Sequence, residues 1–467
     1  MSNFKGAIEQ IHELKSGKTS AAQTTGEVLD CIASIDSAGY ELRSVLALSQ
    51  HSQSYSAQDL LSTPLAGLPI LIKDNVEAIG LPASAGSEFL IDFPVTQDSP
   101  LTARLRKAGA QIIGATNLSE WANIRSTQST SGWSALGGLT ANPWQHGRSA
   151  GGSSSGSGAA IAAGIVSMAV GSETDGSIIC PASLNGCVGI KPTVGSIPRD
   201  QMVPISASQD SPGPMTRTVA DAALMLEIMM DSTGLVKASQ SPAPLRIGVI
   251  STWITPNDAT NSLFLDSVSK LSRAGIEIIE IAIEEPSDSV GEDEYNVLLH
   301  ELFDDLGAYF QIRTRGKYSS LAELVDFNHS HQGTEMKYFN QDLFDQALAL
   351  GGRGEAYQIR RNRNLAWANE VLAKALNGVD VAIGTSYSPA WLSTLGKGDD
   401  HSGASWITMA PSIAGTPIGA LPMGLVDGLP VGLGVIAGRN EEAQLVRAMS
   451  AIERALGIGI LEPTFIK

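Results

Sequence analysis

Two segments of the chain carry serines among glycines in an arrangement that suits nucleophilic chemistry. The segment 171–177 reads Gly-Ser-Glu-Thr-Asp-Gly-Ser and follows IVSMAVG (165–171), a run typical of a buried strand. Successive backbone N–H groups on such a turn can converge on an anion. Ser177 ends this turn and is therefore a candidate nucleophile beside a candidate oxyanion hole.

The second segment lies between residues 131 and 158 and ends in RSAGGSSSGSG, with Ser153 inside it. Composition alone predicts a flexible linker. Its position favours a site loop, because a helix of small residues, AAIAAG, follows at once and a helix N-terminus presents backbone N–H groups. Gly152 to Gly156 also fits the G-x-S-x-G nucleophile elbow, but no strand precedes it and no later histidine lies in a triad context.

Lys73 ends the apolar run GLPILIK (67–73), which predicts a buried strand. Burial lowers the pKa of a lysine because the charged form loses its hydration, and a neutral lysine can act as a general base. A lysine after a strand is more often a solvated strand end when taken alone. The hypothesis of a base therefore depends on the two serine segments.

Other motifs carry no chemistry. Ser16-Gly17-Lys18-Thr19 resembles the end of a phosphate-binding loop, but that motif needs a glycine at position 12, which is His. His329 and His331 are two residues apart and do not share a helix face for a metal. We expect no metal and no other cofactor.

Composition excludes several classes of protein. The 467 residues carry a net charge of −17 with no run of Lys and Arg, so a nucleic acid is not an expected partner. No apolar stretch is long enough to cross a bilayer, and the first 20 residues have no apolar core of a secretory signal. We expect a cytoplasmic protein with no membrane partner. The sequence leaves open whether it is a monomer or a homodimer.

Helix and strand patterns alternate along the chain. TARLRKAG followed by AQIIGATN (102–117) predicts a helix and then a strand, and late strands are predicted at 379–385, 417–424 and 429–438. This alternation predicts an α/β fold with a mixed or parallel sheet. The polar connection 231–244 is the best candidate for a seam between subdomains.

Taken together, these motifs resemble the amidase signature family. That family has a Gly-Gly-Ser-Ser-Gly-rich loop, then a Gly-Ser loop, with a lysine upstream, and this chain has Gly151-Gly152-Ser153-Ser154, Gly176-Ser177 and Lys73 in LIKDN. The flanking segments GATNLSEWA, NPW, GIKPTVG, GPMTRTVADAA and GTPIGALPMG fit as well, so the resemblance covers nearly the whole chain.

The resemblance implies one large α/β domain over residues 1–467, with a central mixed β-sheet surrounded by helices. Residues 1–230 would bear the catalytic core, and 245–467 would form a more variable substrate-side part. It also implies roles for particular residues. Ser177 would be the acyl-forming nucleophile, Lys73 the base, and Ser153, after a cis peptide bond, the proton relay. The backbone N–H groups of Thr174, Asp175, Gly176 and Ser177 would form the oxyanion hole.

Two departures from the common pattern narrow the branch. The common Asp-Thr-Gly-Gly-Ser-Ile-Arg is here Glu-Thr-Asp-Gly-Ser-Ile-Ile (173–179). This variant, with SLAELVDFNHSH (320–331), is similar to bacterial peptide amidases. Asp175 could cap neighbouring backbone N–H groups, or it could border the acyl pocket and accept a hydrogen bond from a substrate.

The predicted function is an amidase that hydrolyses carboxylic or peptide C-terminal amides through an acyl-enzyme. One alternative is the amidase subunit of a tRNA-dependent amidotransferase. Ile179 in place of arginine, Asp175 and the lack of a basic docking segment argue against it. Another alternative is a non-catalytic amide-binding protein of the same fold. The complete Lys-Ser-Ser set argues against that protein.

Overall fold

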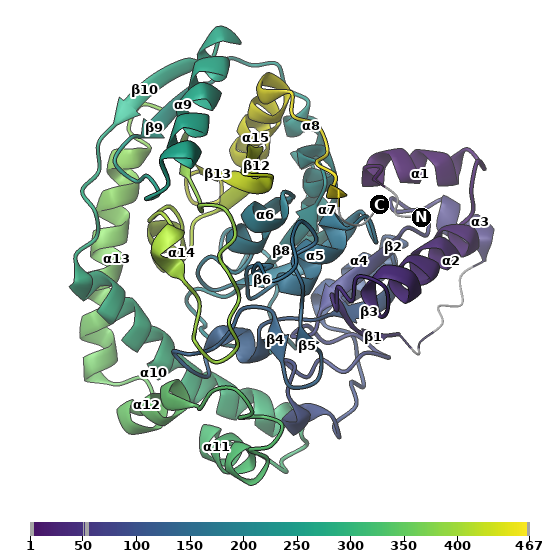
Figure 1. Ribbon diagram of the computed structural model, residues 1–467, viewed down its shortest axis with the longest axis vertical. Coiled ribbons are helices and arrows are strands. Elements are labelled where there is room, and N and C mark those ends of the chain that lie inside the picture. The colour runs from purple at the N-terminus through teal and green to yellow at the C-terminus, as the bar shows by residue number, and fades with distance from the viewer. Residues whose placement is uncertain (1–3, 50, 52–55, 465–467) are drawn as a thin grey trace.

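The centre of the computed structural model, which describes residues 4–49, 51 and 56–464, is a mixed sheet of eleven strands (Figure 1). The strand order is β1-β3-β2-β6-β8-β7-β12-β13-β11-β9-β10. The strands are β1 (Val45–Leu48), β2 (Pro69–Lys73), β3 (Gln111–Thr116), β6 (Met168–Glu173), β7 (Val188–Lys191), β8 (Ser211–Thr216), β9 (Arg246–Ile250), β10 (Glu277–Ile281), β11 (Val381–Thr385), β12 (Ile418–Val426) and β13 (Leu429–Ile436). A separate ribbon pairs β4 (Trp133–Ser134) with β5 (Gly138–Leu139).

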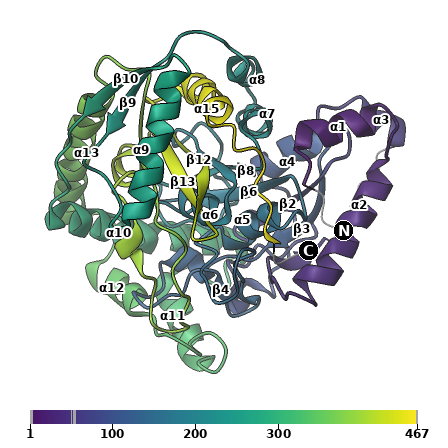
Figure 2. The same cartoon turned by 45° about the horizontal axis from the view of Figure 1, so that its top comes forward.

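Helices cover both faces of the sheet (Figures 1 and 2). One face packs against α1 (Ala7–Lys15), α4 (Pro100–Lys107), α7 (Val219–Met230), α8 (Leu235–Ser239), α9 (Asp258–Arg273) and α15 (Glu442–Leu456). The other face packs against α2 (Ala21–Cys31), α5 (Ser155–Ala162), α6 (Ile179–Asn185), α13 (Glu355–Ala375) and α14 (Met409–Ala414). The remaining helices are α3 (Ala57–Leu61), α10 (Asp288–Arg313), α11 (Leu321–Ser330) and α12 (Asp342–Leu350).

Side-chain alternation along the strands explains this layering. In β2, Ile70 and Ile72 enter the core on one face while Leu71 enters the core on the other. In β6, Val170 and Ala169 divide in the same way. Successive side chains of a strand point to opposite faces, so a strand buried on both faces must be apolar throughout. The short apolar runs of the sequence are therefore central strands.

A smaller core forms where α10, α11 and α12 gather, at the bottom of Figure 1. Aromatic side chains dominate it: Phe89 and Phe310 have ring centroids 4.9 Å apart, and Trp121 meets the edge of Phe344 at 6.1 Å. Because Phe89 and Trp121 come from the first third of the chain, this core joins the acidic helices of the second half to the loops that follow β2 and β3.

The structure confirms the predicted α/β class and the single central mixed sheet. Strands from residues 45–216 form one half of the sheet and strands from 246–436 form the other, and they meet where β7 pairs antiparallel with β12. The polar connection 231–244 contains α8, which packs against α7 and α15. Among the described residues, no helix is long and apolar enough to span a membrane.

Candidate active site

The site lies at the carboxyl ends of three parallel strands. β2 pairs in parallel with β3 and with β6, so the last residues of these strands, Lys73, Thr116 and Glu173, come to one edge of the sheet. The carboxyl edge of parallel strands is the usual position of a binding site in an open α/β sheet. The two serine segments of the sequence both reach this edge.

Lys73 is fully buried and surrounded by hydroxyl and carbonyl oxygens. Its Nζ donates to Ser153 Oγ at 2.7 Å, to Ser172 Oγ at 2.9 Å and to Ser154 Oγ at 3.0 Å, and it lies 3.2 Å from the Ser172 carbonyl oxygen. Asn75 Nδ2 donates to the same Ser172 hydroxyl at 2.9 Å. The apolar run that ends in Lys73 thus delivers its amine to the serine segments, as its sequence predicts.

Burial sets the acid–base behaviour of this amine. Removal from water lowers the pKa of Lys73 to about 7, and the charges of Asp210 and then Glu173 oppose that shift. An amine with a pKa near neutrality exchanges its proton readily at physiological pH, which an ordinary lysine does not.

The Gly/Ser segment is an ordered loop that leads into α5. The peptide bond between Gly152 and Ser153 is cis, and α5 begins at Ser155, inside the segment and earlier than the sequence indicates. Ser154 connects this loop to the second serine segment: its N–H donates to the Ser177 carbonyl at 3.1 Å, and its hydroxyl donates to the Ser172 carbonyl at 3.0 Å. The two serine loops therefore lie against each other.

The loop from Thr174 to Ser177 is shaped by Glu173 below it. Glu173 Oε2 accepts the N–H of Ile178 at 2.6 Å and of Ile179 at 2.9 Å, so the buried carboxyl caps the start of α6. In the described part of the chain, the N–H groups of residues 175–177 donate to no protein acceptor. These three donors are available to an anion.

Position 176 requires a glycine for two reasons, its backbone conformation and the closeness of Tyr387. It has φ +75°, and a Cβ at this position would lie 2.8 Å from the Tyr387 hydroxyl. Any other residue would therefore strain the turn and displace Tyr387. The glycine keeps the loop close to the wall of the cavity.

A cavity of about 430 Å³ borders the loop. Ser177 and Thr174 line it, and Ser177 is half-buried, whereas Ser153 is fully buried behind the wall. Much of the lining is apolar or aromatic: Ile124, Ile205, Leu298, Tyr387, Trp406 and Met409. The volume is ordinary for a small-molecule site.

Three carboxyl groups line the same cavity, namely Asp175, Glu294 and Asp399, and its lining contains no Lys or Arg. Asp175 Oδ1 accepts from Ser412 Oγ of α14 at 3.0 Å, and the carboxyl group also bonds the Thr408 side chain, so its partners are these hydroxyls and not an N–H of its own loop. Burial, and then the charge of Asp175, raise the pKa of Glu294 well above its ordinary value. Asp399 accepts from the N–H and hydroxyl of Ser131.

Sequence reasoning missed several residues that the fold adds to the site. By alternation, Ser172 shares the face of β6 that carries Val170. Lys73 shares the other face of the sheet with Leu71, so alternation could not predict their contact, which forms where the two strands end. Asp210 and Glu294 had no local signal, because they reach the site through strand pairing and through α10. The four residues that the sequence predicts for the loop, Thr174 to Ser177, do line one cavity.

Comparison with known proteins identifies the family. A family model described as amidase matches residues 30–446. The chain belongs to the amidase signature family. It is therefore a hydrolase of amide C–N bonds, and the Ser-Ser-Lys triad is characteristic of its family.

Solved and curated relatives cover almost the full chain. The native peptide amidase of Stenotrophomonas maltophilia is 34% identical with a TM-score of 0.88, covering 99% of this chain and 98% of that one. One subunit of the glutamyl-tRNA(Gln) amidotransferase of Prochlorococcus marinus is 32% identical over 96% of this chain and 97% of its own length. A putative amidase of Schizosaccharomyces pombe is 31% identical over 88% of this chain and 78% of its own length.

The cap made by Glu173 yields a stability prediction. Glu173→Ala leaves the N–H groups of Ile178 and Ile179 buried without an acceptor, and we expect the free energy of unfolding to fall by about 2–4 kcal/mol. Glu173→Gln keeps a side-chain oxygen at that position and should lose clearly less. Urea unfolding followed by circular dichroism compares the two variants. Equal losses of unfolding free energy in the two variants would show that Glu173 does not stabilise the protein by capping α6.

Proposed function

We propose that the enzyme hydrolyses carboxylic amides, and peptide C-terminal amides in particular, with Ser177, Ser153 and Lys73 as its catalytic triad. The observation that carries the proposal is the 2.7 Å contact between Lys73 Nζ and Ser153 Oγ, directly behind a cavity that Ser177 lines. Of the two parts expected from the sequence, 1–230 supplies this triad and 245–467 supplies much of the cavity wall.

The triad would transfer protons in a relay. Neutral Lys73 accepts a proton from Ser153, which accepts one from Ser177 as the Ser177 oxygen attacks the amide carbon. The oxyanion that forms is bound by N–H groups of the loop from Thr174 to Ser177. The tetrahedral intermediate collapses, the C–N bond breaks, and the relay returns the proton to the leaving amine. Water then hydrolyses the acyl-enzyme by the same relay in reverse.

The charge of the cavity supports a neutral or cationic substrate. The lining has three carboxyl groups, one imidazole, that of His401, and no Lys or Arg. It therefore disfavours a carboxylate and favours N–H donors, which a peptide backbone supplies. The 34% identity to a peptide amidase over 99% of the chain supports the same substrate class. The net charge of −17 supports a mechanism without nucleic acid.

A second candidate is the amidase subunit of a tRNA-dependent amidotransferase, which the 32% identical relative favours. That function would require partner subunits and glutamine as the ammonia donor. Copurification of the chain from its native host, followed by an assay of glutamine-dependent transamidation, distinguishes the two. Glutamine carries an α-carboxylate, which the acidic cavity disfavours.

Removal of the proposed nucleophile should abolish turnover. Loss of one member of a triad that acts as a unit can reduce turnover by about a millionfold, so Ser177→Ala should fall to background with an unchanged melting temperature. Ser183→Ala is a control. Ser183 is a buried serine of α6 whose hydroxyl forms a hydrogen bond with Ser386, and it does not line the cavity. Substantial amide hydrolysis by Ser177→Ala would exclude Ser177 as the nucleophile.

The pH dependence of kcat/KM should reflect the protonation of Lys73. Burial lowers the pKa of Lys73 to about 7, and its protonated form cannot accept a proton, so kcat/KM should decline as pH falls below about 7. Lys73→Met should remove most activity and flatten this acid limb. Lys191→Met is the matched control, because Lys191 is also fully buried, with a pKa lowered by burial to about 8, but lies on β7. A limb that persists in Lys73→Met belongs to another group.

Substrate charge should control the rate. We expect amino-acid amides with a free or acetylated α-amine to be hydrolysed with a kcat/KM at least about tenfold higher than the succinylated amide, which corresponds to about 1.4 kcal/mol of repulsion. Raising the salt concentration should narrow the difference. A kcat/KM for the succinylated amide equal to that for the acetylated amide would mean that the three carboxyl groups do not repel a negative charge on the acyl part of the substrate.

A further inference from the structure

A buried carboxylate, Asp210, lies behind the candidate oxyanion loop. In the antiparallel pair of β6 and β8, Glu173 lies opposite Ser211, so the next residues along, Thr174 and Asp210, face each other just beyond the ladder. Thr174 Oγ1 donates to Asp210 Oδ1 at 2.7 Å. Strand register, and not sequence proximity, therefore brings this carboxylate to the loop.

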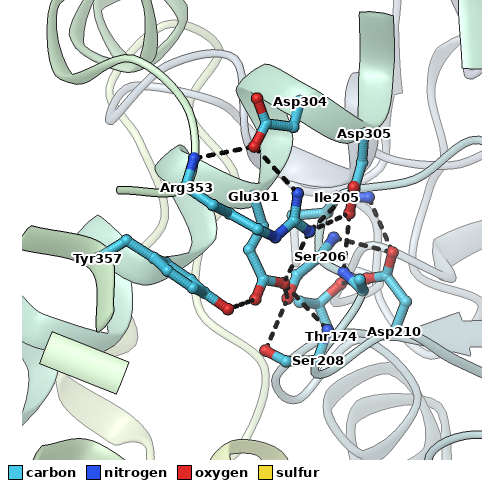
Figure 3. Close-up of polar contacts among 11 residues, drawn as sticks. Thr174, Ile205, Ser206, Ser208, Asp210, Glu301, Asp304, Asp305, Arg353 and Tyr357 are labelled. Atoms are coloured by element: carbon cyan, nitrogen blue, oxygen red, sulfur yellow. Dashed lines mark hydrogen bonds and ion pairs between the residues drawn. The ribbon is translucent and has the colours of Figure 1, made fainter. Parts of the chain in front are cut away.

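The second oxygen of Asp210 binds its own chain segment. Oδ2 accepts the N–H of Ile205 at 2.8 Å and of Ser206 at 2.9 Å, and the side chain is almost fully buried. With three hydrogen bonds, the carboxylate ties the segment 205–210 to Thr174 (Figure 3). Burial raises the pKa of Asp210 to about 6, so the group is charged at neutral pH.

Helix α10 holds the outer side of the same segment. Glu301 Oε2 accepts from the Ser206 hydroxyl at 2.5 Å and from the Ser208 N–H at 3.0 Å, and Asp305 accepts the N–H of Ala207 at 3.0 Å. Glu301 and Asp305 are four residues apart, which places them on one helix face. Figure 3 shows this face turned toward the segment.

A residue of α10 nearer the cavity completes the attachment. Gln209 Nε2 donates to Glu294 at 2.8 Å and reaches the Thr174 carbonyl at 3.4 Å. Glu294 lies seven residues before Glu301 and shares its face of the helix. Every residue from 205 to 210 is thus bonded to Asp210, to α10 or to Thr174.

Two further side chains fix the acidic face itself. Arg353 contacts both carboxylate oxygens of Asp305 at 2.9 Å, and Tyr357 donates to Glu301 Oε1 at 2.6 Å. Arg353 also pairs with Asp304 at 3.2 Å (Figure 3). The like charges of α10 are held together by this guanidinium, so the segment is attached to a rigid support.

Asp210 also acts on Lys73 by its charge. Two carboxylates oppose the lowering of the Lys73 pKa by burial, Asp210 more strongly than Glu173. Lys191 and Asp175 act on Glu173 by their charges, and Arg199 acts on Asp210. When Lys73 takes up a proton, a nearby negative charge favours its ammonium.

We propose that Asp210 is a positioning residue with two effects: it holds Thr174, and with it the oxyanion loop, in place, and it keeps a negative charge close to Lys73. The inference rests on the proposed function, in which Lys73 is the base and the loop binds the oxyanion. Asp210 touches no reacting atom and acts through these two groups.

The test compares Asp210→Asn with Asp36→Asn. Asp36 is a matched control: it is equally buried, and it too accepts one serine hydroxyl and two backbone N–H groups, from Ser44 and Val45. We expect the acid limb of kcat/KM to move about one pH unit lower in Asp210→Asn, because the charge that favours protonated Lys73 is gone. Asp36→Asn should leave the limb where it is in the wild type.

The plateau above the limb measures the positioning effect. We expect kcat at high pH to fall roughly tenfold or more in Asp210→Asn with KM little changed, since an oxyanion interaction is made in the transition state. Thr174→Val removes only the hydroxyl and should lower kcat in the same way without moving the limb. An unmoved limb in Asp210→Asn, or a wild-type kcat in Thr174→Val, would overturn the proposal. Thr174→Val keeps the test decisive if Asp210→Asn does not fold.

Failure of the proposed function gives a different pattern. In that case Ser177→Ala or Lys73→Met would stay active, or the acid limb would survive in Lys73→Met. Failure of the present inference alone leaves those two variants inactive while the limb of Asp210→Asn stays unmoved or the kcat of Thr174→Val stays that of the wild type.

Discussion

The structure of the site depends on one feature that is unfavourable in free energy, the complete burial of the Lys73 ammonium. A charged amine in the interior is stable only where polar groups replace its lost water. Here hydroxyls of Ser153, Ser154 and Ser172 take that role at 2.7–3.0 Å. Ser153, the proposed proton relay, is therefore also one of the groups that solvate the proposed base, and for this reason the Gly/Ser loop must be ordered and close to the strand end.

The sheet provides the geometry for this arrangement. Parallel pairing of β2 and β6 aligns Lys73 with the start of the loop, and antiparallel pairing of β6 with β8 sets Asp210 opposite Thr174. A one-residue slip in either register would turn these side chains to the other face. The apolar alternation of Ile70, Leu71 and Ile72 into two cores prevents such a slip, so core packing fixes the distances of the site.

The sequence predicts the local part of this picture and misses the part made by pairing. The strand that ends in Lys73, the Gly/Ser site loop and the 174–177 turn follow from the residue patterns, and the resemblance to the family singled out Lys73 and Ser153 within them. Asp210 could not be predicted, because its partner Thr174 is 36 residues away and only the register of two strands relates them. The partners of Asp175 were also out of reach, since Thr408 and Ser412 come from the start of α14 and Ser412 is 237 residues later.

Helix α10 connects the cavity wall to the support of the 174–177 loop. Its Glu294 lines the cavity, while Glu301 and Asp305, on the same face, hold the segment that Asp210 ties to Thr174. A change in α10 that reshapes the cavity therefore also changes the support of the proposed oxyanion loop. The part of the wall that α10 forms cannot vary independently of the loop, because this one helix supports both. Asp399 also lines the cavity but is held by Ser131 and Trp391 and not by α10, so a substitution of Asp399 changes the cavity without changing the support that α10 gives to the loop.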